Sequence, residues 1–168
     1  MPETLRVGLI GANARDGWSP RAHIPALMEL PDVELAALCT AHEETATESA
    51  REFGVGQAYH DHRRMLREAD IDAVGVSVRV PSHHSLTMDA LEAGKHVYTE
   101  WPLGANLGEA EEMAELARRK GVHTMVGLQG RCSPVFLRLK ELVEEGFVGE
   151  VLAANLTSFG SGVLSRTS

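Results

Sequence analysis

Cysteine, positive charge and long apolar segments are all scarce in this sequence of 168 residues. Its two cysteines, Cys39 and Cys132, lie far apart and lack CxxC spacing, which argues against a disulfide framework and agrees with a reducing cytoplasm. No apolar run approaches the roughly 20 residues that span a membrane, and the first residues contain no apolar signal-peptide core. The sequence therefore predicts a cytoplasmic location without a membrane contact.

The charge balance is acidic, because 16 lysines and arginines stand against 24 aspartates and glutamates and give a net charge of -8. The short basic runs Arg63–Arg64 and Arg118–Lys120 lie on predicted helices, where charged faces are usually solvated. We therefore expect no nucleic-acid partner for the chain by itself. Hydrophobic residues make up 43% of the sequence, as in soluble domains that bury a core.

Strand-like and helix-like segments alternate along the chain. Short apolar runs bounded by turn residues predict strands at Leu5–Gly11, Val33–Cys39, Gln57–Tyr59, Ile71–Val78, His96–Glu100 and Val122–Gly127. Capping residues and apolar periodicity predict the helices between and after them, at 20–30, 40–53, 61–69, 82–94, 106–121 and 133–146. Such continuously apolar strands are typical of a parallel sheet covered on both faces. The predicted fold class is therefore α/β, a Rossmann doubly wound, mostly parallel sheet.

The end of the sequence departs from this alternation. Residues 150–159 read as one more strand, and 160–168 are rich in glycine and serine. A strand just past a complete Rossmann unit usually opens a second domain. We expect a Rossmann domain over residues 1–149, followed at 150–168 by the first strand and tail of a truncated C-terminal domain.

The turn after the first predicted strand, Gly11–Trp18, has the composition of a dinucleotide-binding loop. In Rossmann domains the glycines of this turn let the backbone approach a pyrophosphate, and the following helix N-terminus favours its negative charge. The turn is not a clean GxGxxG, because Asn13 stands at the second glycine; asparagine tolerates a positive φ, so we expect the turn to survive. The alternative is a plain tight turn, but its place after the first strand favours the dinucleotide loop.

The second predicted strand ends at Cys39 without the acidic residue that binds the ribose hydroxyls of NAD. Thr40 follows and is able to hydrogen-bond to a 2′-phosphate, and Arg15 is a second candidate for that region. These residues favour NADP slightly over NAD. The alternative is that Thr40 only caps the next helix, in a capping box with Glu43, although one hydroxyl can serve both roles.

Three longer segments, Val7–Leu27, Ala93–Leu103 and Val126–Pro134, resemble the glucose–fructose oxidoreductase, inositol dehydrogenase and rhizopine-catabolism (Gfo/Idh/MocA) family. The likeness extends from residue 5 to about residue 159. Within the family, three further features resemble the branch of the galactose-pathway repressor. These are the Gly17–Trp18 pair, Ser77–His84 and Glu100–Gly104.

The resemblance implies a nicotinamide cofactor lying across the C-terminal ends of the strands. The residues expected along it are Gly11, Ala12, Asn13, Gly17, Trp18, Thr40, Val78, Pro81, His84, Glu100, Trp101, Gln129 and Arg131. The glycine loop would lie near the pyrophosphate and Thr40 near the adenosine ribose. Glu100 and Trp101 would lie near the nicotinamide ribose, with Gln129 and Arg131 at the border of the pocket.

Two departures from the family pattern bear on catalysis. Dehydrogenases of the family carry Glu-Lys-Pro after the fifth strand, and their lysine supports proton transfer, whereas this chain has Trp101 there. Indole has no titratable proton, and loss of a positioned acid–base group costs roughly 10²–10⁴-fold in rate. The second departure is that the chain stops where the family's substrate domain, which also builds its dimers, would begin. Catalytic residues stay unassigned, and we expect little or no turnover from this chain.

Several other residues are ambiguous from the sequence. His84 is read either as a cofactor contact or as an exposed helix start, and Trp101 either as a pocket wall or as packing at the sheet edge. The cis or trans state of its bond to Pro102 is open. His60-Asp61-His62 lacks a third ligand nearby, so we expect no metal site. Cys132 has no histidine partner that the sequence can place, which argues against a catalytic cysteine.

Three functions are compatible with these observations. The leading interpretation is an NAD(P)-binding domain of a Gfo/Idh/MocA-type oxidoreductase that transfers hydride to or from a sugar or polyol, with a homo-oligomer allowed in a full-length form. The alternative is a non-catalytic, NAD(P)-sensing regulatory protein like the galactose-pathway repressor, which the missing lysine favours. The third is a Rossmann domain that binds no ligand.

Overall fold

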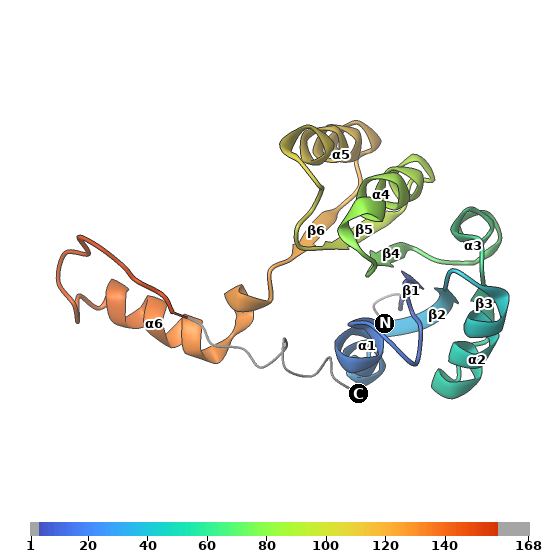
Figure 1. Cartoon of the computed structure of the whole chain (residues 1–168), viewed down its shortest axis with the longest axis horizontal. Coiled ribbons are helices and arrows are strands. Elements are labelled where there is room, and N and C mark those ends of the chain that lie inside the picture. Colours follow the sequence, from blue (N-terminus) through green and yellow to red (C-terminus); the bar gives the residue numbers. More distant parts are fainter. Residues whose placement is uncertain (1–3, 158–168) are drawn as a thin grey trace, which may run out of the picture. The chain divides into compact units, whose positions relative to one another are not determined.

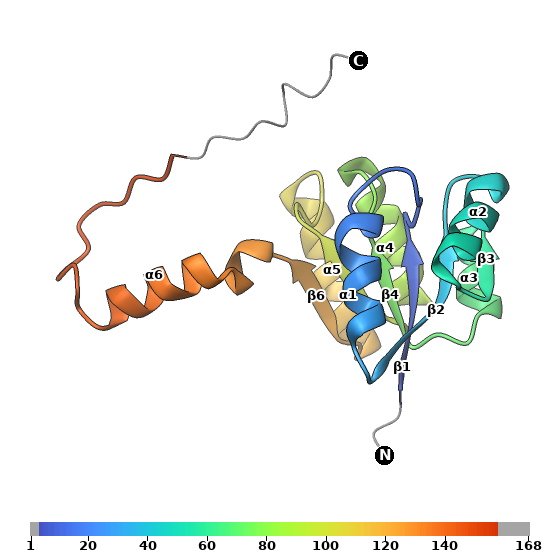
Figure 2. The same cartoon turned by 90° about the horizontal axis from the view of Figure 1, so that it is seen from below.

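The computed structural model describes residues 4–157. These residues form two compact units, divided between Leu128 and Gln129. Figures 1 and 2 show the chain in two views. The two units are described separately, and the first contains the sheet.

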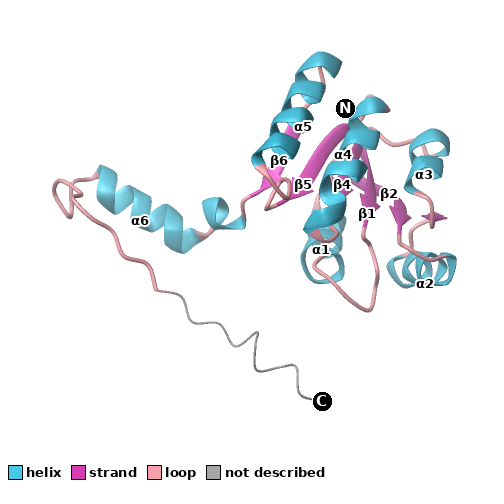
Figure 3. Ribbon diagram, turned by 45° about the horizontal axis from the view of Figure 1, so that its top comes forward, coloured by secondary structure: helices cyan, strands magenta, loops and turns pink. Residues whose placement is uncertain are grey.

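The first unit is built on a six-stranded parallel sheet in the order β3-β2-β1-β4-β5-β6. The strands are β1 (Leu5–Ile10), β2 (Val33–Cys39), β3 (Gln57–Tyr59), β4 (Ala73–Val76), β5 (His96–Glu100) and β6 (Thr124–Gly127). This is the strand order of a doubly wound Rossmann domain, so the predicted fold class is confirmed. Figure 3 shows the strands in one layer between helices.

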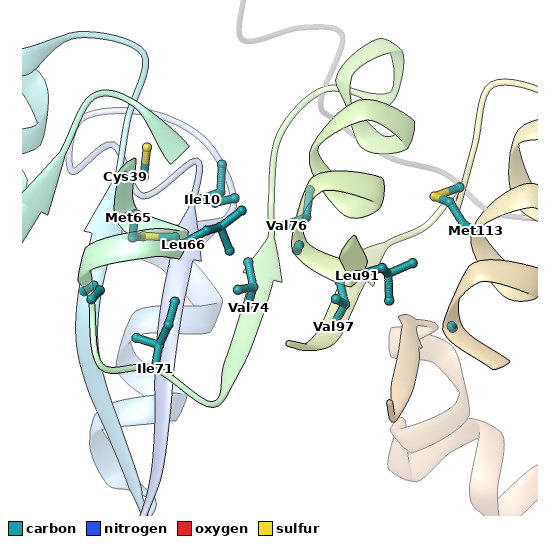
Figure 4. Close-up of a cluster of buried hydrophobic side chains, with 14 of the residues drawn as sticks. Ile10, Cys39, Met65, Leu66, Ile71, Val74, Val76, Leu91, Val97 and Met113 are labelled. Carbon is teal, nitrogen blue, oxygen red and sulfur yellow. The ribbon is translucent and has the colours of Figure 1, made fainter. Parts of the chain in front are cut away.

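Helices cover both faces of the sheet. The unit's helices are α1 (Ile24–Glu29), which continues a π-helical turn η1 (Ser19–His23), then α2 (Glu43–Phe53), α3 (His62–Glu68), α4 (His83–Glu92), which follows the 3₁₀ turn η2 (Val80–Ser82), and α5 (Leu107–Lys120). One buried cluster joins the sheet to α3, α4 and α5 (Figure 4), and a second joins it to α1 and α2. None of the described helices is both long and apolar enough to cross a membrane.

Local signals placed most element ends correctly. Gly54 and Gly121 end α2 and α5 in the left-handed conformation, and Asn106 caps α5 by accepting a hydrogen bond from the amide of Glu109. The predicted capping box at Thr40 is wrong: α2 begins at Glu43 without a side-chain cap. The strand predicted at Ile71–Val78 is shorter, Ala73–Val76, because the chain leaves the sheet after Val76.

The second unit contains the 3₁₀ turn η3 (Gln129–Cys132) and α6 (Pro134–Glu144). Residues 150–157, predicted to begin a strand, have no secondary structure, and 158 and 159 lie outside the described residues. A strand needs a neighbouring strand for its backbone hydrogen bonds, and no strand occurs among the described residues of this unit. The domain division predicted at residue 149 and the extent of a C-terminal domain stay predictions.

An ion pair between Arg6 and Asp72 connects the start of β1 to the start of β4. The guanidinium of Arg6 donates to both carboxylate oxygens of Asp72, at 3.1 and 2.8 Å, and its backbone amide donates at 2.9 Å. These hydrogen bonds, the side-chain ones first, lower the pKa of Asp72 to about 2. A carboxylate whose pKa is lowered in the folded state stabilises the fold at pH values above the ordinary carboxyl pKa. This stabilisation is lost as the pH falls through the pKa of the folded state.

We therefore expect Asp72→Asn to lower the free energy of unfolding at neutral pH by about 1 kcal/mol, a value discounted for the partial exposure of the pair. The difference from the wild type should disappear between about pH 4 and pH 2. Urea unfolding across this range measures it. Asp70→Asn is the control, because Asp70 contacts the same arginine but is largely exposed; an equal loss in both variants would contradict the assignment.

Candidate functional site

A cleft of about 710 Å³ opens at the C-terminal ends of the strands. Its walls follow β1, β2, β4 and β5, so it lies where the strand order reverses between β1 and β4. Ligands of doubly wound sheets bind at this switch point, and the volume suits a small molecule or cofactor. Predicted residues that line the cleft are Gly11, Asn13, Gly17, Trp18, Thr40, Val78, Glu100 and Trp101.

Gly11 makes the floor of the cleft possible. Its φ is +88°, and a Cβ built on it would lie 2.0 Å from the carbonyl oxygen of Ser77. The amide of Gly11 donates to the carbonyl of Cys39 at 2.9 Å, and the Ser19 hydroxyl donates to the carbonyl of Gly11 at 2.9 Å. The backbone of the turn therefore passes close to the ends of β2 and β4, and only glycine fits there.

The rest of the turn differs from the expectation for Asn13. Among residues 4–157 only glycines have positive φ, so Asn13 does not replace the second glycine by adopting that conformation. Instead its side-chain oxygen accepts a hydrogen bond from the amide of Arg15 at 3.0 Å, which closes an Asx turn. The amide of Ala14 donates to Ser49, and that of Gly17 donates to Asp16. A diphosphate bound here would compete with these side-chain acceptors for the loop amides.

Beyond β2, the hydroxyls of Thr40 and Thr45 hold the turn into α2. They lie 2.7 Å apart, and each is 2.9 Å from the carbonyl oxygen of His42, so their two protons are shared among one hydrogen bond between the hydroxyls and the hydrogen bonds to that carbonyl. Arg15 does not line the cleft; its guanidinium bonds to Glu48 of α2 at 2.6 Å, and this hydrogen bond raises the pKa of Arg15. Thr40 is therefore a cleft residue whose hydroxyl supports the turn without capping the helix.

Two tryptophans border the cleft, and they are the only two in the sequence. Trp18 is 48% exposed and Trp101 is 63% exposed, so both indoles remain accessible to a ligand. Trp101 therefore lies at the cleft, and its role as a wall of the nicotinamide pocket stays a prediction. Its bond to Pro102 is cis.

Glu100 lies at the end of β5, lines the cleft and is 9% exposed. Its Oε1 lies 2.5 Å from Nε2 of His23 and accepts a hydrogen bond from the Tyr98 hydroxyl at 3.1 Å. The imidazole of His23 also packs edge-on against the ring of Tyr98. These contacts give the carboxylate a fixed position at the cleft.

Three further predicted residues of the first unit do not line the cleft. Ala12 is fully buried, and Pro81 and His84 are not among the lining residues. His84 instead contacts Glu112 of α5 at 2.8 Å. Gln129 and Arg131 belong to the second unit, so their predicted position at the border of the pocket stays a prediction.

The sequence reasoning missed His83, the neighbour of His84. His83 is 1% exposed; its Nδ1 lies 2.8 Å from the carbonyl oxygen of Pro102, and its Nε2 lies 3.0 Å from that of Val78. It therefore connects the segments that follow β4 and β5 at the cleft. Helical spacing was the available signal, because the buried positions of α4 are His83, Thr87, Ala90 and Leu91.

Other cleft residues not predicted as site residues are Ile10, Asp16, Cys39, Ala41, His42, Thr45, His60, His62, Ser77, Arg79, Ser82 and Leu86. Burial raises the pKa of the Cys39 thiol to about 12, with a smaller contribution from Asp61, so this thiol is a poor nucleophile. Within residues 4–157 no group of three or more acidic, histidine or cysteine side chains is arranged to hold a metal ion.

A parallel sheet in this strand order, with a glycine turn after its first strand and a cleft at its switch point, defines the class of dinucleotide-binding Rossmann domains. The comparison with known families agrees. Residues 5–128 match the model of the oxidoreductase family with an NAD-binding Rossmann fold. The chain belongs to this family, Gfo/Idh/MocA.

Two curated relatives represent different functions. The chain is 36% identical to the dehydrogenase AclE of Aspergillus oryzae, over 93% of this chain and 44% of the relative. It is 32% identical to the galactose/lactose metabolism regulatory protein Gal80 of Saccharomyces cerevisiae, over 93% of this chain and 38% of that protein. The chain thus spans less than half the length of these relatives.

Two solved structures are similar in fold as well. A scyllo-inositol dehydrogenase from Lactobacillus casei with NAD(H) and scyllo-inositol has a TM-score of 0.79 and 25% identity, over 88% of this chain and 43% of that one. A mutant of the 3-ketoreductase KijD10 from Actinomadura kijaniata with NADP has a TM-score of 0.81 and 29% identity, over 89% and 46%.

Proposed function

We propose that this chain binds NAD(P) as the nucleotide-binding domain of an oxidoreductase that acts on a sugar or polyol. The observation that carries the proposal is the cleft at the switch point, where Gly11 brings the backbone against the ends of β2 and β4. A side chain at this position would overlap the backbone of Ser77 and force the turn away from the place where its backbone would approach a diphosphate. The polyol scyllo-inositol in the name of one similar structure supports the substrate class.

The residues of the cleft suggest an orientation for the cofactor. The diphosphate would face the turn from Gly11 to Trp18, the adenosine ribose would face Thr40, and the nicotinamide ribose would face Glu100. The accessible indole of Trp101 is placed to form an apolar wall for the nicotinamide ring. When bound, the nicotinamide supplies hydride transfer; the chain itself binds and orients it. NADP is preferred over NAD in this proposal, because the end of β2 carries no acidic residue in the cleft.

A regulatory function is the second candidate, and Trp101 favours it. Indole cannot exchange a proton with a substrate hydroxyl, and the relative Gal80 is named as a regulatory protein. Assaying NAD(P)-dependent oxidation over a panel of sugars and polyols separates the two. Appreciable turnover by this chain would exclude the purely regulatory function. If Trp101→Lys creates activity in a longer form of the protein, the protein would be an enzyme that has lost its activity.

Fluorescence titration with NADH and NADPH tests the binding proposal directly. Because both tryptophans line the cleft, a nicotinamide bound there should quench their emission saturably and receive their energy. Trp101→Phe should reduce the energy transfer while binding persists. If neither nucleotide gives a saturable signal, the binding proposal is wrong and the chain is a Rossmann domain that binds no dinucleotide.

Asp16 should weaken dinucleotide binding in the wild type. Its carboxylate lines the cleft and accepts the hydrogen bond of the Gly17 amide at 2.7 Å, so it places negative charge where the diphosphate would lie. Asp16→Asn keeps the acceptor and removes the charge. A repulsion of about 1 kcal/mol between exposed charges corresponds to about fivefold tighter NADH binding, larger at low salt.

Asp32→Asn is the matched control for this prediction. It changes the net charge equally, but Asp32 precedes β2 and so lies at the opposite edge of the sheet. If both variants tighten binding equally, the effect comes from the total charge of the protein and the local repulsion is refuted.

The proposal also includes a cytoplasmic location and, for a longer form of the protein, a homo-oligomer. The two unpaired cysteines, Cys39 and Cys132, agree with a reducing cytoplasm. A homo-oligomer of a longer form stays a prediction, as does the absence of a nucleic-acid partner.

A further inference from the structure

Arg79 is the only lysine or arginine among the residues that line the cleft. It follows β4 and is exposed, and its guanidinium makes no ion pair and no hydrogen bond within residues 4–157. A guanidinium keeps its charge throughout the pH range in which proteins are folded, so this positive charge does not depend on a titration. Arg79 is therefore a permanent cation in the cleft that an anionic ligand can reach.

The backbone that leads to Arg79 lies against the glycine turn. β1 and β4 are neighbouring parallel strands (Figure 3), and the amide of Ser77 donates to the carbonyl of Ile10 at 2.9 Å. A Cβ built on Gly11 would lie 2.8 Å from Cγ1 of Val78, the residue before Arg79. The side chain of Arg79 therefore starts beside the turn that would face a diphosphate.

The backbone on both sides of Arg79 is anchored. The carbonyl oxygen of Val78 lies 3.0 Å from Nε2 of the buried His83, and the carbonyl of Arg79 itself accepts a hydrogen bond from the amide of Ser82 at 3.0 Å. Binding a ligand would thus order only the side chain of Arg79, which limits the entropic cost of the contact.

The glycine turn itself offers little positive charge to a diphosphate. The amides of Ala14, Arg15 and Gly17 all donate to side-chain oxygens of the protein. Pro20, at the start of the helical segment after the turn, has no amide hydrogen to donate. Asp16 lines the cleft and adds a negative charge. A doubly charged diphosphate at this turn therefore needs a cation from another part of the cleft.

The other candidates for that cation are less suitable. Arg15 belongs to the turn, but it does not line the cleft, and its guanidinium is paired with Glu48 at 2.6 Å. The histidines that line the cleft follow β2 and β3, whereas the turn lies between the ends of β1 and β4. Arg79 combines a permanent charge, a place in the cleft and a backbone beside the turn.

We propose that Arg79 binds the diphosphate of the dinucleotide from the β4 side of the cleft and supplies the positive charge that the glycine turn lacks. The inference rests on the proposed function and names a residue that holds the cofactor by a different interaction from the turn amides. A guanidinium donates two parallel charge-assisted hydrogen bonds to the oxygens of a phosphate group. Dinucleotide binding therefore depends on an exposed ion pair and weakens as the salt concentration rises.

The experiment measures NADH binding to the 168-residue chain by quenching of tryptophan emission at low and at high salt. We expect Arg79→Gln to weaken binding about tenfold at low salt and about threefold at ~0.3 M salt, where exposed charges are screened. Arg79→Lys keeps the charge but loses the paired donors, so it should weaken binding only about threefold at low salt. Both variants should unfold at the same urea concentration as the wild type, because the side chain has no partner within residues 4–157.

Arg51→Gln is the matched control. Arg51 lies in the last turn of α2, is exposed, does not line the cleft and, like Arg79, has no side-chain partner within residues 4–157. An equal loss of NADH binding in Arg51→Gln and Arg79→Gln would trace the effect to net charge and overturn the inference. Unchanged NADH binding in Arg79→Gln would overturn it too, as expected if Arg79 meets an anionic substrate, while the proposed function would stand. If the wild type binds no NADH, both proposals fail.

Discussion

Gly11→Ala should unfold at far lower urea concentration than the wild type and lose dinucleotide binding. A Cβ at this position would lie 2.0 Å from the carbonyl oxygen and 2.7 Å from the carbonyl carbon of Ser77, which are backbone atoms that cannot rotate away. The residue also has a φ of +88°, which alanine adopts only with strain. Strain and overlap together amount to about 3–5 kcal/mol of unfolding free energy.

Gly17→Ala separates the two causes. Gly17 also has a positive φ, at +100°, but a Cβ there meets no atom within 4 Å. It should cost only the conformational strain, about 1–2 kcal/mol. Urea unfolding of both variants measures the difference, and NADH titration measures binding. A Gly11→Ala protein as stable as Gly17→Ala would show that the ends of β1 and β4 are not packed as described.

The second large effect is expected from His83→Ala. The substitution removes a fully buried ring together with its contacts to the carbonyls of Val78 and Pro102. A carbonyl only accepts hydrogen bonds, so the neutral ring donates to one of the two and the protonated ring donates to both. The cavity left by the buried ring and the loss of its hydrogen bonding to these carbonyls lower the free energy of unfolding by about 3 kcal/mol.

Binding should suffer as well, because Val78 and Trp101 line the cleft on the segments that His83 connects. We expect NADH to bind about tenfold more weakly to His83→Ala, measured under conditions where the variant is folded. His84→Ala is the control on the adjacent residue. Its contact with Glu112 lies at the exposed surface, so its loss should change stability by less than about 0.5 kcal/mol and leave binding intact. Equal effects at the two positions would refute the role of His83.

Much of the fold was predictable because its signals are local. The limits of β2, β3 and β5 match the apolar runs, and Gly54, Asn106 and Gly121 mark helix ends through their own backbone or side-chain preferences. The predictions that failed involved competing local options. Thr40 has the chemistry of a cap, but its hydroxyl donates to the carbonyl of His42, and the chain after β4 turns into the cleft instead of continuing the strand.

The candidate site was predictable only in part. Motifs identify the glycine turn and Trp101, whereas the family resemblance points to His84 and not to the buried His83. Helical spacing separates the two, since one residue along a helix rotates the side chain by about 100°. No local signal indicates that Ser49 accepts the hydrogen bond of the Ala14 amide, because the two residues lie 35 positions apart in the sequence.

The sequence by itself determined the alternation of strands and helices, the place of the glycine turn and the presence of tryptophan instead of lysine at position 101. Each depends on residue type and on spacing over a few positions. The tertiary structure decided which side chains meet, as when strand pairing brings His42 and His60 to one end of the cleft and Glu100 to another. Such contacts depend on strand order and register, which short-range preferences do not encode.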